Sequence, residues 1–278
     1  MFRRTAQGLA NEHLFHRVDY MVYCEGESID NVSLSLDEVF WSKVFSAGSK
    51  KVRIKSIGSK TNATEILRDV RGGILKNTIV ALDSDYGFFF EDIPVHPQVF
   101  YTHGYSWESD VVQSVDIEKA LALFCNVRDL NAAKTQFLDF MQKNARLFWR
   151  AALIDMRYIA SPGQLFNRQK PVSIIKPGAD GFPKLGCGDI ILRACALKNT
   201  GAKPQSLPFD GPANGIRYFF GKTASRFVYH WFVAFSSKLK SKRSVPYDAF
   251  MSLLIGVIDL RSGISQRDFY YQRALAQI

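Results

Sequence analysis

The stretch that decides the fold is Thr78-Ile-Val-Ala-Leu-Asp-Ser-Asp-Tyr-Gly87, an apolar run that stops at two aspartates and a glycine. Its first five residues have the β-branched, apolar character of a buried strand. Upstream, Tyr20–Cys24 has the same character and ends at Glu25-Gly26. Because functional groups of an open parallel α/β sheet gather at the carboxyl ends of its strands, these two strand ends are the first candidates for chemistry.

Strands and helices alternate around this stretch. The pattern predicts an α/β fold with a parallel sheet, right-handed crossovers and flanking helices. Ser35 or Asp37 can cap the first of the helices. The expected elements besides the two strands above are a helix at Ser35–Ala47, a strand at Lys51–Ile57, a helix at Asn62–Arg71 and a short strand at Val99–Thr102.

The second half is mostly helical and contains one loop-rich segment. Residues 161–215 hold 15 of the 29 glycines and prolines, and loops often carry recognition. We expect a domain over residues 1–125 and a helical region over residues 126–278. The helices predicted from apolar periodicity are Ser114–Asn126, Leu130–Ala160, Asp189–Lys198, Lys222–Lys240 and Tyr247–Arg261.

Charge is distributed unevenly along the chain. Lys and Arg number 36 and Asp and Glu number 26, which gives a net charge of +10. Residues 1–125 carry 13 basic and 17 acidic side chains, whereas residues 126–278 carry 23 basic and 9 acidic ones. This asymmetry favours a surface in the second half that binds a polyanion or an acidic partner. The alternative is a solvated basic surface without a partner.

The sequence also indicates in which cellular compartment the protein is expected. The 4 cysteines show no CxxC pair, so neither a zinc site nor a disulfide framework is expected. The first residues contain no apolar signal region, and the longest apolar run, near Phe250–Ile258, is too short to span a membrane. We therefore expect a cytoplasmic protein that does not bind membranes.

Three carboxylates follow the two principal strands: Glu25, Asp83 and Asp85. If the strands are neighbours, these groups converge, and like charges so close together require a cation. An all-oxygen set suits Mg²⁺ or Mn²⁺, which can activate water and neutralise charge on a phosphodiester. The alternative is that Asp83-Ser-Asp-Tyr-Gly87 is a turn, since these residue types favour turns.

The order of these motifs resembles a Toprim domain. It is most similar to the Toprim nucleases of the OLD type, and among them to the effector nucleases of the PARIS anti-phage systems. The likeness covers roughly residues 18–125. The residues that carry it are Val22–Gly26, Val39–Phe45, Gly58–Lys60 and Val80–Gly87, together with Tyr101–Glu108.

The resemblance implies a role for each motif residue. Glu25 would be a metal-linked acid or general base, Asp83 and Asp85 would hold the metal, and Glu108 would complete its shell. Lys60 would meet the scissile phosphate as a point charge. The alternatives are a solvent-exposed lysine at position 60 and a helix-initial acid at position 108, where the macrodipole favours it.

One departure separates this chain from the family pattern. Residues 29–36 are inserted between Glu27 and the helix that contains Phe40-Trp41. The family's Asp after the Glu-Gly pair has no direct equivalent, so no role is assigned to Asp30 or Asp37.

A basic helix in the second half is a candidate nucleic-acid surface. Lysine and arginine pair with phosphates, and bases can stack on the aromatic rings of Phe227–Phe235. The alternative is a packed aromatic helix with a solvated basic end. No complete P-loop, GxSxG or HExxH motif is present. The candidate binding residues are Lys222, Arg226, Lys238, Lys240, Lys242 and Arg243.

The predicted function is metal-dependent cleavage of nucleic acid. The resemblance implies that the substrate is tRNA, cut in an abortive defence against phage. It also implies an ABC-type (AAA) ATPase partner that inhibits the nuclease until a trigger releases it, and a homodimer of the freed subunit. Two alternatives stay open: a DNA nuclease or nickase on the same site, and a non-catalytic binding protein.

Overall fold

The chain divides into two compact units in the computed structural model. The sheet unit comprises Met1–Ser84, Asp92–His103 and Ile258–Ile278, and the helical unit comprises Asp85–Glu91 and Gly104–Val257. The expected division at residue 125 differs from this one, because the first helices after the sheet group with the helical unit. The structure describes residues 6–26, 33–58, 60–90, 96–113, 115–125, 127–158, 166–201, 215–239 and 245–278.

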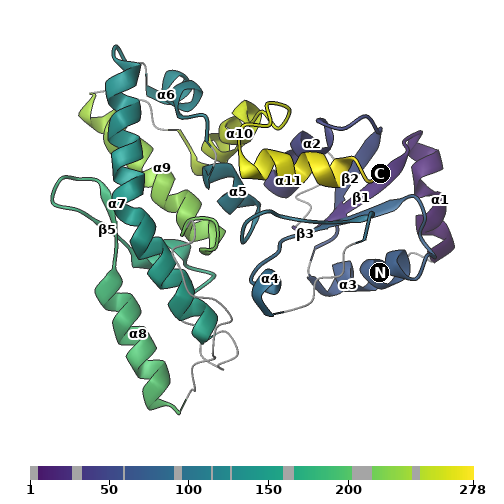
Figure 1. Ribbon diagram of the computed structural model, residues 1–278, viewed down its shortest axis with the longest axis horizontal. Helices are drawn as coiled ribbons and strands as arrows, with labels where there is room; N and C mark the ends of the chain where they lie inside the picture. Colours follow the sequence, from purple (N-terminus) through teal and green to yellow (C-terminus); the bar gives the residue numbers. More distant parts are fainter. Residues whose placement is uncertain are drawn as a thin grey trace. The chain divides into compact units, whose positions relative to one another are not determined.

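The sheet unit is built on four parallel strands in the order β2-β1-β3-β4 (Figure 1). This arrangement confirms the expected parallel α/β sheet. The strand β1 lies between β2 and β3, so the strands that precede Glu25 and Asp83 are direct neighbours. The strands are β1 (Tyr20–Cys24), β2 (Val52–Ser56), β3 (Thr78–Leu82) and β4 (Val99–Tyr101).

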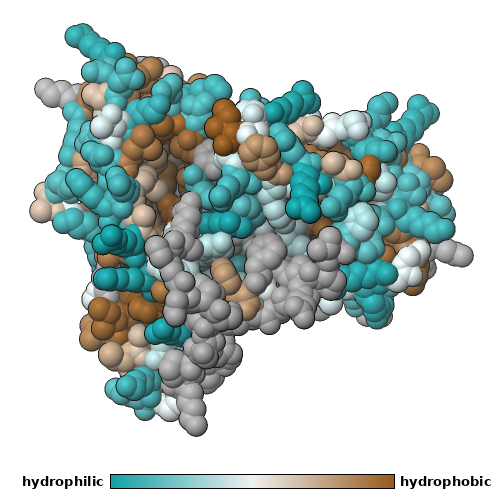
Figure 2. Space-filling view, in the orientation of Figure 1, coloured by the Kyte–Doolittle hydropathy of each residue, from teal (hydrophilic) through white to brown (hydrophobic). Residues whose placement is uncertain are grey.

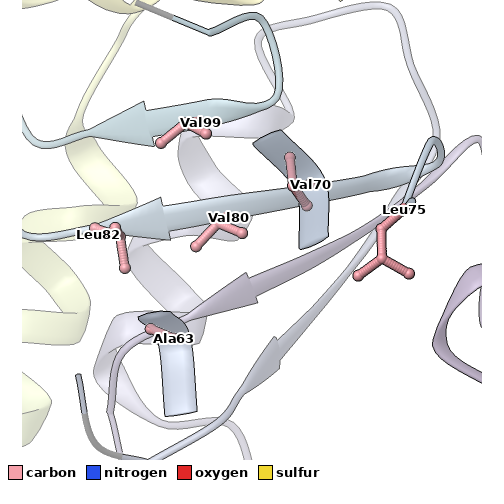
Figure 3. Packing of buried hydrophobic residues seen from close by; sticks show 6 residues of the cluster. All are labelled: Ala63, Val70, Leu75, Val80, Leu82 and Val99. Atoms are coloured by element: carbon pink, nitrogen blue, oxygen red, sulfur yellow. The ribbon is translucent and has the colours of Figure 1, made fainter. Parts of the chain in front are cut away.

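Two helices, α1 (Ala6–His16) and α3 (Lys60–Arg71), cover one face of this sheet. Alternate residues of β3 and β4 point toward this face, where they pack against α3 and the turn after it. Figure 3 shows the apolar cluster that results, and partly buried Leu9 and Ala10 of α1 pack against it. The members of the cluster are Ala63, Val70, Leu75, Val80, Leu82 and Val99.

The other face is covered by α2 (Leu36–Phe45) and α11 (Gln266–Leu275). The ring of Phe45 lies 4.9 Å from that of Phe100 in β4, and Trp41 packs edge-on against Tyr271 of α11. Ser35 caps α2 through a capping box with Glu38, which confirms one of the two expected caps. Both faces of the sheet are therefore covered, which explains why all five residues of β3 are buried.

The helical unit is organised around α9 (Gly221–Lys238), which packs against α5, α6, α10, η1 and β6. Its buried face is aromatic: Trp231 lies edge-on to Phe137, and Phe227 lies edge-on to Phe148. The other elements are α4 (Gly87–Phe90), α5 (Trp107–Gln113), α6 (Ile117–Cys125), α7 (Leu130–Arg157), η1 (Pro171–Ile174), β5 (Ile175–Pro177), β6 (Pro183–Leu185), α8 (Cys187–Asn199) and α10 (Tyr247–Val257).

Several boundaries differ from the sequence expectations. The last predicted helix ends at Val257 instead of Arg261, and α11 follows it as a separate helix that was not expected. The loop-rich segment contains a small antiparallel hairpin, β5–β6. Among the described residues, none of the helices is both long enough and apolar enough to cross a membrane.

Candidate functional site

Glu25 and Asp83 lie at the same edge of the sheet. In the parallel pairing of β1 with β3, Cys24 stands opposite Ala81, so the first residues beyond both strands emerge together at their carboxyl ends. Both carboxylate side chains are half-buried. The condition on which the sequence argument depends, that these two strands are neighbours, is therefore met, and Glu25 and Asp83 follow strands that end at the same edge.

Asp37 also lies at this edge, although the sequence analysis assigned it no role in the candidate site. A Cβ atom built on Gly26 would stand 2.8 Å from the Asp37 Cγ, so the carboxyl group packs directly against this glycine. Gly26 has a φ of 117° and forms an isolated bridge with Gly58. The left-handed backbone and the close carboxyl group together explain why a glycine follows Glu25.

The charge at this edge acts on its neighbour Cys24. Burial raises the pKa of the Cys24 thiol, and the charges of Asp37, Glu38 and Asp83 raise it further. Glu38 is engaged in the fold, since its two oxygens accept hydrogen bonds from the backbone N–H groups of Ser35 and Ser56. Glu38 is therefore an acid of this edge that serves the fold.

Asp85, in the helical unit, adopts a strained backbone conformation. Its φ of 47° lies in the left-handed region, which few residues other than glycine adopt. Its backbone N–H donates a 2.8 Å hydrogen bond to the carbonyl of Tyr105. Non-glycine residues in such conformations cluster at functional sites, where the surrounding structure holds them.

Glu108 is a buried acid of the helical unit that lies near Asp85. It is only 4% exposed, and it accepts a hydrogen bond from the Ser106 hydroxyl. Burial raises the pKa of Glu108, the Asp85 charge adds to that rise, and the charge of Lys222 opposes it. Within this unit, the structure therefore brings together Asp85, Glu108 and Lys222.

The first residue of α9 must be small because Glu108 and its neighbours press against it. A Cβ on Gly221 would overlap the Ser106 hydroxyl and would lie 3.1 Å from the Glu108 Oε2. The carboxylate of Glu108 thus sits beside the amino-terminal end of an 18-residue helix, where the macrodipole favours negative charge. Glu108 also lies in the first turn of its own helix α5, as the helix-initial alternative expects, and both this alternative and the metal-ligand role are compatible with its position.

The solvent side of α9 carries the basic residues that the sequence singled out. Lys222 and Arg226 are four residues apart and lie on one face of the helix, whereas Lys238, near its other end, is rotated by about 160° from Lys222 at 3.6 residues per turn. Lys222 and Lys238 are exposed, and the Arg226 guanidinium stacks 3.4 Å from the ring centroid of Tyr247. His230 follows Arg226 by one turn and is half-buried on this same face.

A pocket of about 300 Å³ opens beside this face, between α9 and the β5–β6 hairpin. Lys176, Pro183, His230 and Val233 are among its lining residues. Burial and the Arg226 charge lower the pKa of His230, so its imidazole is neutral at pH 7. The pocket therefore combines an apolar wall, a neutral imidazole and an adjoining cation.

Another surface feature of the helical unit is the apolar side of α8. Ile191 and Leu192 are 57% and 70% exposed. Figure 2 shows hydrophobic surface over this helix. Exposed apolar groups that gather in this way are typical of surfaces that contact other molecules.

Some predicted residues fall outside what the structure describes. Lys60 is the first residue of α3, but its side chain is outside the described part. Lys240, Lys242 and Arg243 lie outside the described residues altogether, as does Asp30.

The donor chemistry fits a hard cation. Glu25, Asp83, Asp85 and Glu108 offer only carboxylate oxygens, the ligands that Mg²⁺ and Mn²⁺ prefer. Within the described ranges, no group of three or more His, Cys, Asp or Glu side chains is arranged to hold a metal ion. The four acids therefore match Mg²⁺ or Mn²⁺ in the chemistry of their oxygen ligands, and the match does not extend to their arrangement.

Comparison with models of known protein families and with curated proteins finds no match to this chain. The resemblance to OLD-type Toprim nucleases therefore rests on the motif residues of the sequence.

Proposed function

We propose that this protein is a metal-dependent endonuclease of the Toprim class, similar to the OLD-type nucleases. The observation that carries the proposal is the parallel pairing of β1 with β3, which brings Glu25 and Asp83 to one edge of the sheet. Asp85 follows two residues after Asp83, so their Cα atoms lie within about 7 Å of each other in any conformation. The strained φ of Asp85 and its interaction with Glu108 further support a functional role for this segment.

The proposed roles follow from the chemistry of each side chain. Asp83, Asp85 and Glu108 would hold Mg²⁺ or Mn²⁺, which when bound neutralises phosphate charge and acidifies water. Glu25 would accept the proton of the attacking water, since a carboxylate at hydrogen-bond distance can act as a general base. Lys60 would pair with a phosphate oxygen as a compact cation.

The basic face of α9 supports a nucleic-acid substrate. Lys222 and Arg226 place two cations on one side of α9, Lys238 adds a third near the end of the helix, and phosphate pairing supplies most of the affinity of such surfaces. The net charge of residues 126–278, with 23 basic and 9 acidic side chains, acts in the same direction. These features favour a polyanion without distinguishing RNA from DNA.

The substrate and partners proposed here rest on the resemblance alone. It implies that tRNA is the substrate, that an ATPase subunit of an anti-phage complex holds the nuclease inactive, and that the freed subunit pairs with a second copy. It also implies that the nuclease acts in the cytoplasm. Cleavage of tRNA there would arrest the growth of the infected cell.

A cleavage assay on the full chain tests this proposal. Wild type, Asp83→Asn and the control Glu65→Gln are incubated with total tRNA and with plasmid DNA, in Mg²⁺ and in EDTA. Glu65 is an exposed acid of α3, so its substitution changes charge without touching the candidate site. We expect tRNA cleavage that EDTA abolishes, that Glu65→Gln preserves and that Asp83→Asn lowers by roughly 10²–10⁴-fold.

Each contrary outcome has a definite meaning. If only the plasmid is cleaved, and cleavage needs the metal, then the substrate is DNA instead of RNA, and the proposed metal site still stands. Cleavage that survives EDTA, or that Asp83→Asn leaves unchanged, would overturn the metal-dependent nuclease.

A further inference from the structure

The helical unit contains a buried polar network directly after Asp85. The left-handed conformation of Asp85 is energetically unfavourable, so it persists only where neighbouring groups hold it. One restraint is the hydrogen bond from its N–H to the Tyr105 carbonyl. The conformation of Asp85 therefore depends on the groups that hold Tyr105 and on those that hold Tyr86, the residue that follows Asp85 in the chain.

Tyr86 is held at both its ring and its hydroxyl. It is 2% exposed, and its ring meets that of Tyr105 edge-on with centroids 4.8 Å apart. Its hydroxyl donates a 2.8 Å hydrogen bond to the Asp155 Oδ2. A side chain fixed at both ends leaves its backbone little freedom, and Asp85 is its immediate neighbour.

Asp155 and Arg168 form the ion pair at the centre of the network. The Arg168 Nη2 lies 3.3 Å from the Asp155 Oδ2, and the Nη1 donates to the Tyr105 hydroxyl. The guanidinium also lies 5.1 Å from the ring centroid of Phe220 and 5.6 Å from that of Tyr105. A planar guanidinium that stacks and donates in two directions joins both tyrosines in one rigid assembly, a task that a lysine performs poorly.

The charges of the network reach Asp85 itself. Burial raises the pKa of Asp155, although the Arg168 charge and the Tyr86 hydrogen bond oppose that rise. Burial disfavours the Arg168 cation, but Tyr105, Asp155, Tyr86 and Asp85 together raise its pKa above the ordinary value. Arg168 is thus a cation close enough to the Asp85 carboxylate to interact with it.

We propose that the Asp155–Arg168 ion pair, acting through Tyr86 and Tyr105, positions the Asp85 carboxylate for metal binding. This inference rests on the proposed function and deepens it. Arg168 and Asp155 are positioning residues, because they act through Asp85 and not on the substrate. Groups that orient metal ligands commonly contribute 10–100-fold to metal affinity or activity.

Mn²⁺ binding, followed by electron paramagnetic resonance, tests the inference without any need for catalysis. The full-length variants are Arg168→Ala, Arg168→Lys and Tyr86→Phe, with Arg150→Ala as the control. Arg150 is an exposed arginine of α7 in the same unit. Tyr86→Phe keeps the buried ring and removes only the hydroxyl, so it remains informative where Arg168→Ala fails to fold.

We expect Arg168→Ala to weaken Mn²⁺ binding by roughly 10–100-fold. Arg168→Lys is expected to restore part of this loss, because it keeps the charge and loses the planar fork. Tyr86→Phe is expected to produce a smaller loss, and Arg150→Ala none. In the cleavage assay, Arg168→Ala should raise the half-saturating Mg²⁺ concentration more than it lowers the rate at saturating Mg²⁺.

A core variant separates positioning from mere stability. Phe232→Leu, in the aromatic core of α9, is expected to lower the melting temperature and leave the Mn²⁺ affinity unchanged. Equal Mn²⁺ binding by wild type, Arg168→Ala and Tyr86→Phe would overturn the positioning role and leave the nuclease proposal intact. A wild-type chain that binds no Mn²⁺ would overturn the proposed function and this inference with it.

Discussion

The two units hold their acidic residues in different ways. In the sheet unit, Glu25 and Asp83 are placed by backbone register, because β1 and β3 are parallel neighbours that end at the same edge. In the helical unit, Glu108 is held by the Ser106 hydroxyl, and we have proposed that the Asp155–Arg168 ion pair positions Asp85. Acids placed by strand pairing should therefore keep their positions when a neighbouring side chain is substituted. Acids placed by a side-chain network should move when any one member of the network is lost.

Core substitutions should reveal how each unit is held together. Trp231→Ala removes the fully buried ring at the centre of the helical unit and is expected to cost about 3–5 kcal/mol of unfolding free energy. Leu75→Ala, in the apolar cluster of the sheet unit, is expected to cost about 2–5 kcal/mol. Urea unfolding of both variants, followed by circular dichroism, measures the two losses.

The exposed substitution Leu253→Ala in α10 provides the control for these losses and should change the midpoint little. A Trp231→Ala variant as stable as this control would show that the aromatic core of α9 does not hold the helical unit.

Gly221→Ala tests the close approach between α9 and the buried acid of the helical unit. The added methyl group overlaps the Ser106 hydroxyl and meets the Glu108 carboxylate, so we expect a loss of about 1–3 kcal/mol. Combining it with Ser106→Ala should recover part of that loss. Gly188→Ala is the control, because nothing lies within 4 Å of a Cβ at that position of α8. Stability that falls equally in both glycine variants would contradict the proposed steric cause.

The smallest expected loss of stability concerns Asp268, in the capping box at the start of α11 in the sheet unit. Burial favours protonated Asp268, but the hydrogen bond and charge of Arg267 hold its pKa below the ordinary value of 3.8. Asp268 also accepts from the backbone of Ser265 in a capping box. Because the folded pKa is the lower one, this carboxylate stabilises the fold at neutral pH. That contribution is lost as pH falls through the ordinary value toward the folded one.

We therefore expect Asp268→Asn to cost about 0.5–2 kcal/mol at pH 7 and less at pH 3. Urea midpoints of wild type and variant at pH 7, 5, 4 and 3 measure the difference. A gap between the two proteins that stays constant across this range would contradict the assigned role of the Asp268 charge.

The sequence predicted the sheet edge well because its signals are local. The bounds of Tyr20–Cys24 and Thr78–Leu82 match β1 and β3 residue for residue, since each is a short apolar run closed by polar residues. The convergence of Glu25 with Asp83 then follows from parallel pairing. The separate helix α11 was missed because its amphipathic pattern is weak and its packing partners lie far away in the chain.

The residues that sequence reasoning missed depend on long-range contacts. Asp37 packs against Gly26, a contact between α2 and the end of β1 that no local sequence pattern indicates. Asp155 lies 69 residues after Tyr86 in the chain, Arg168 lies farther still, and neither stands in a motif. A buried ion pair has no sequence signal unless one of its members interrupts an apolar face, as Asp155 does in α7.

The measurement that tests the central claim most directly compares wild type, Glu25→Ala and the control Glu65→Ala in cells. The cells also carry the ATPase subunit that the proposal implies, a phage trigger is supplied, and growth and tRNA integrity are followed. The account predicts that wild type and Glu65→Ala cut tRNA and arrest growth, whereas Glu25→Ala does neither. Equal arrest in all three strains, or intact tRNA and DNA in all of them, would contradict a nuclease site at the end of β1.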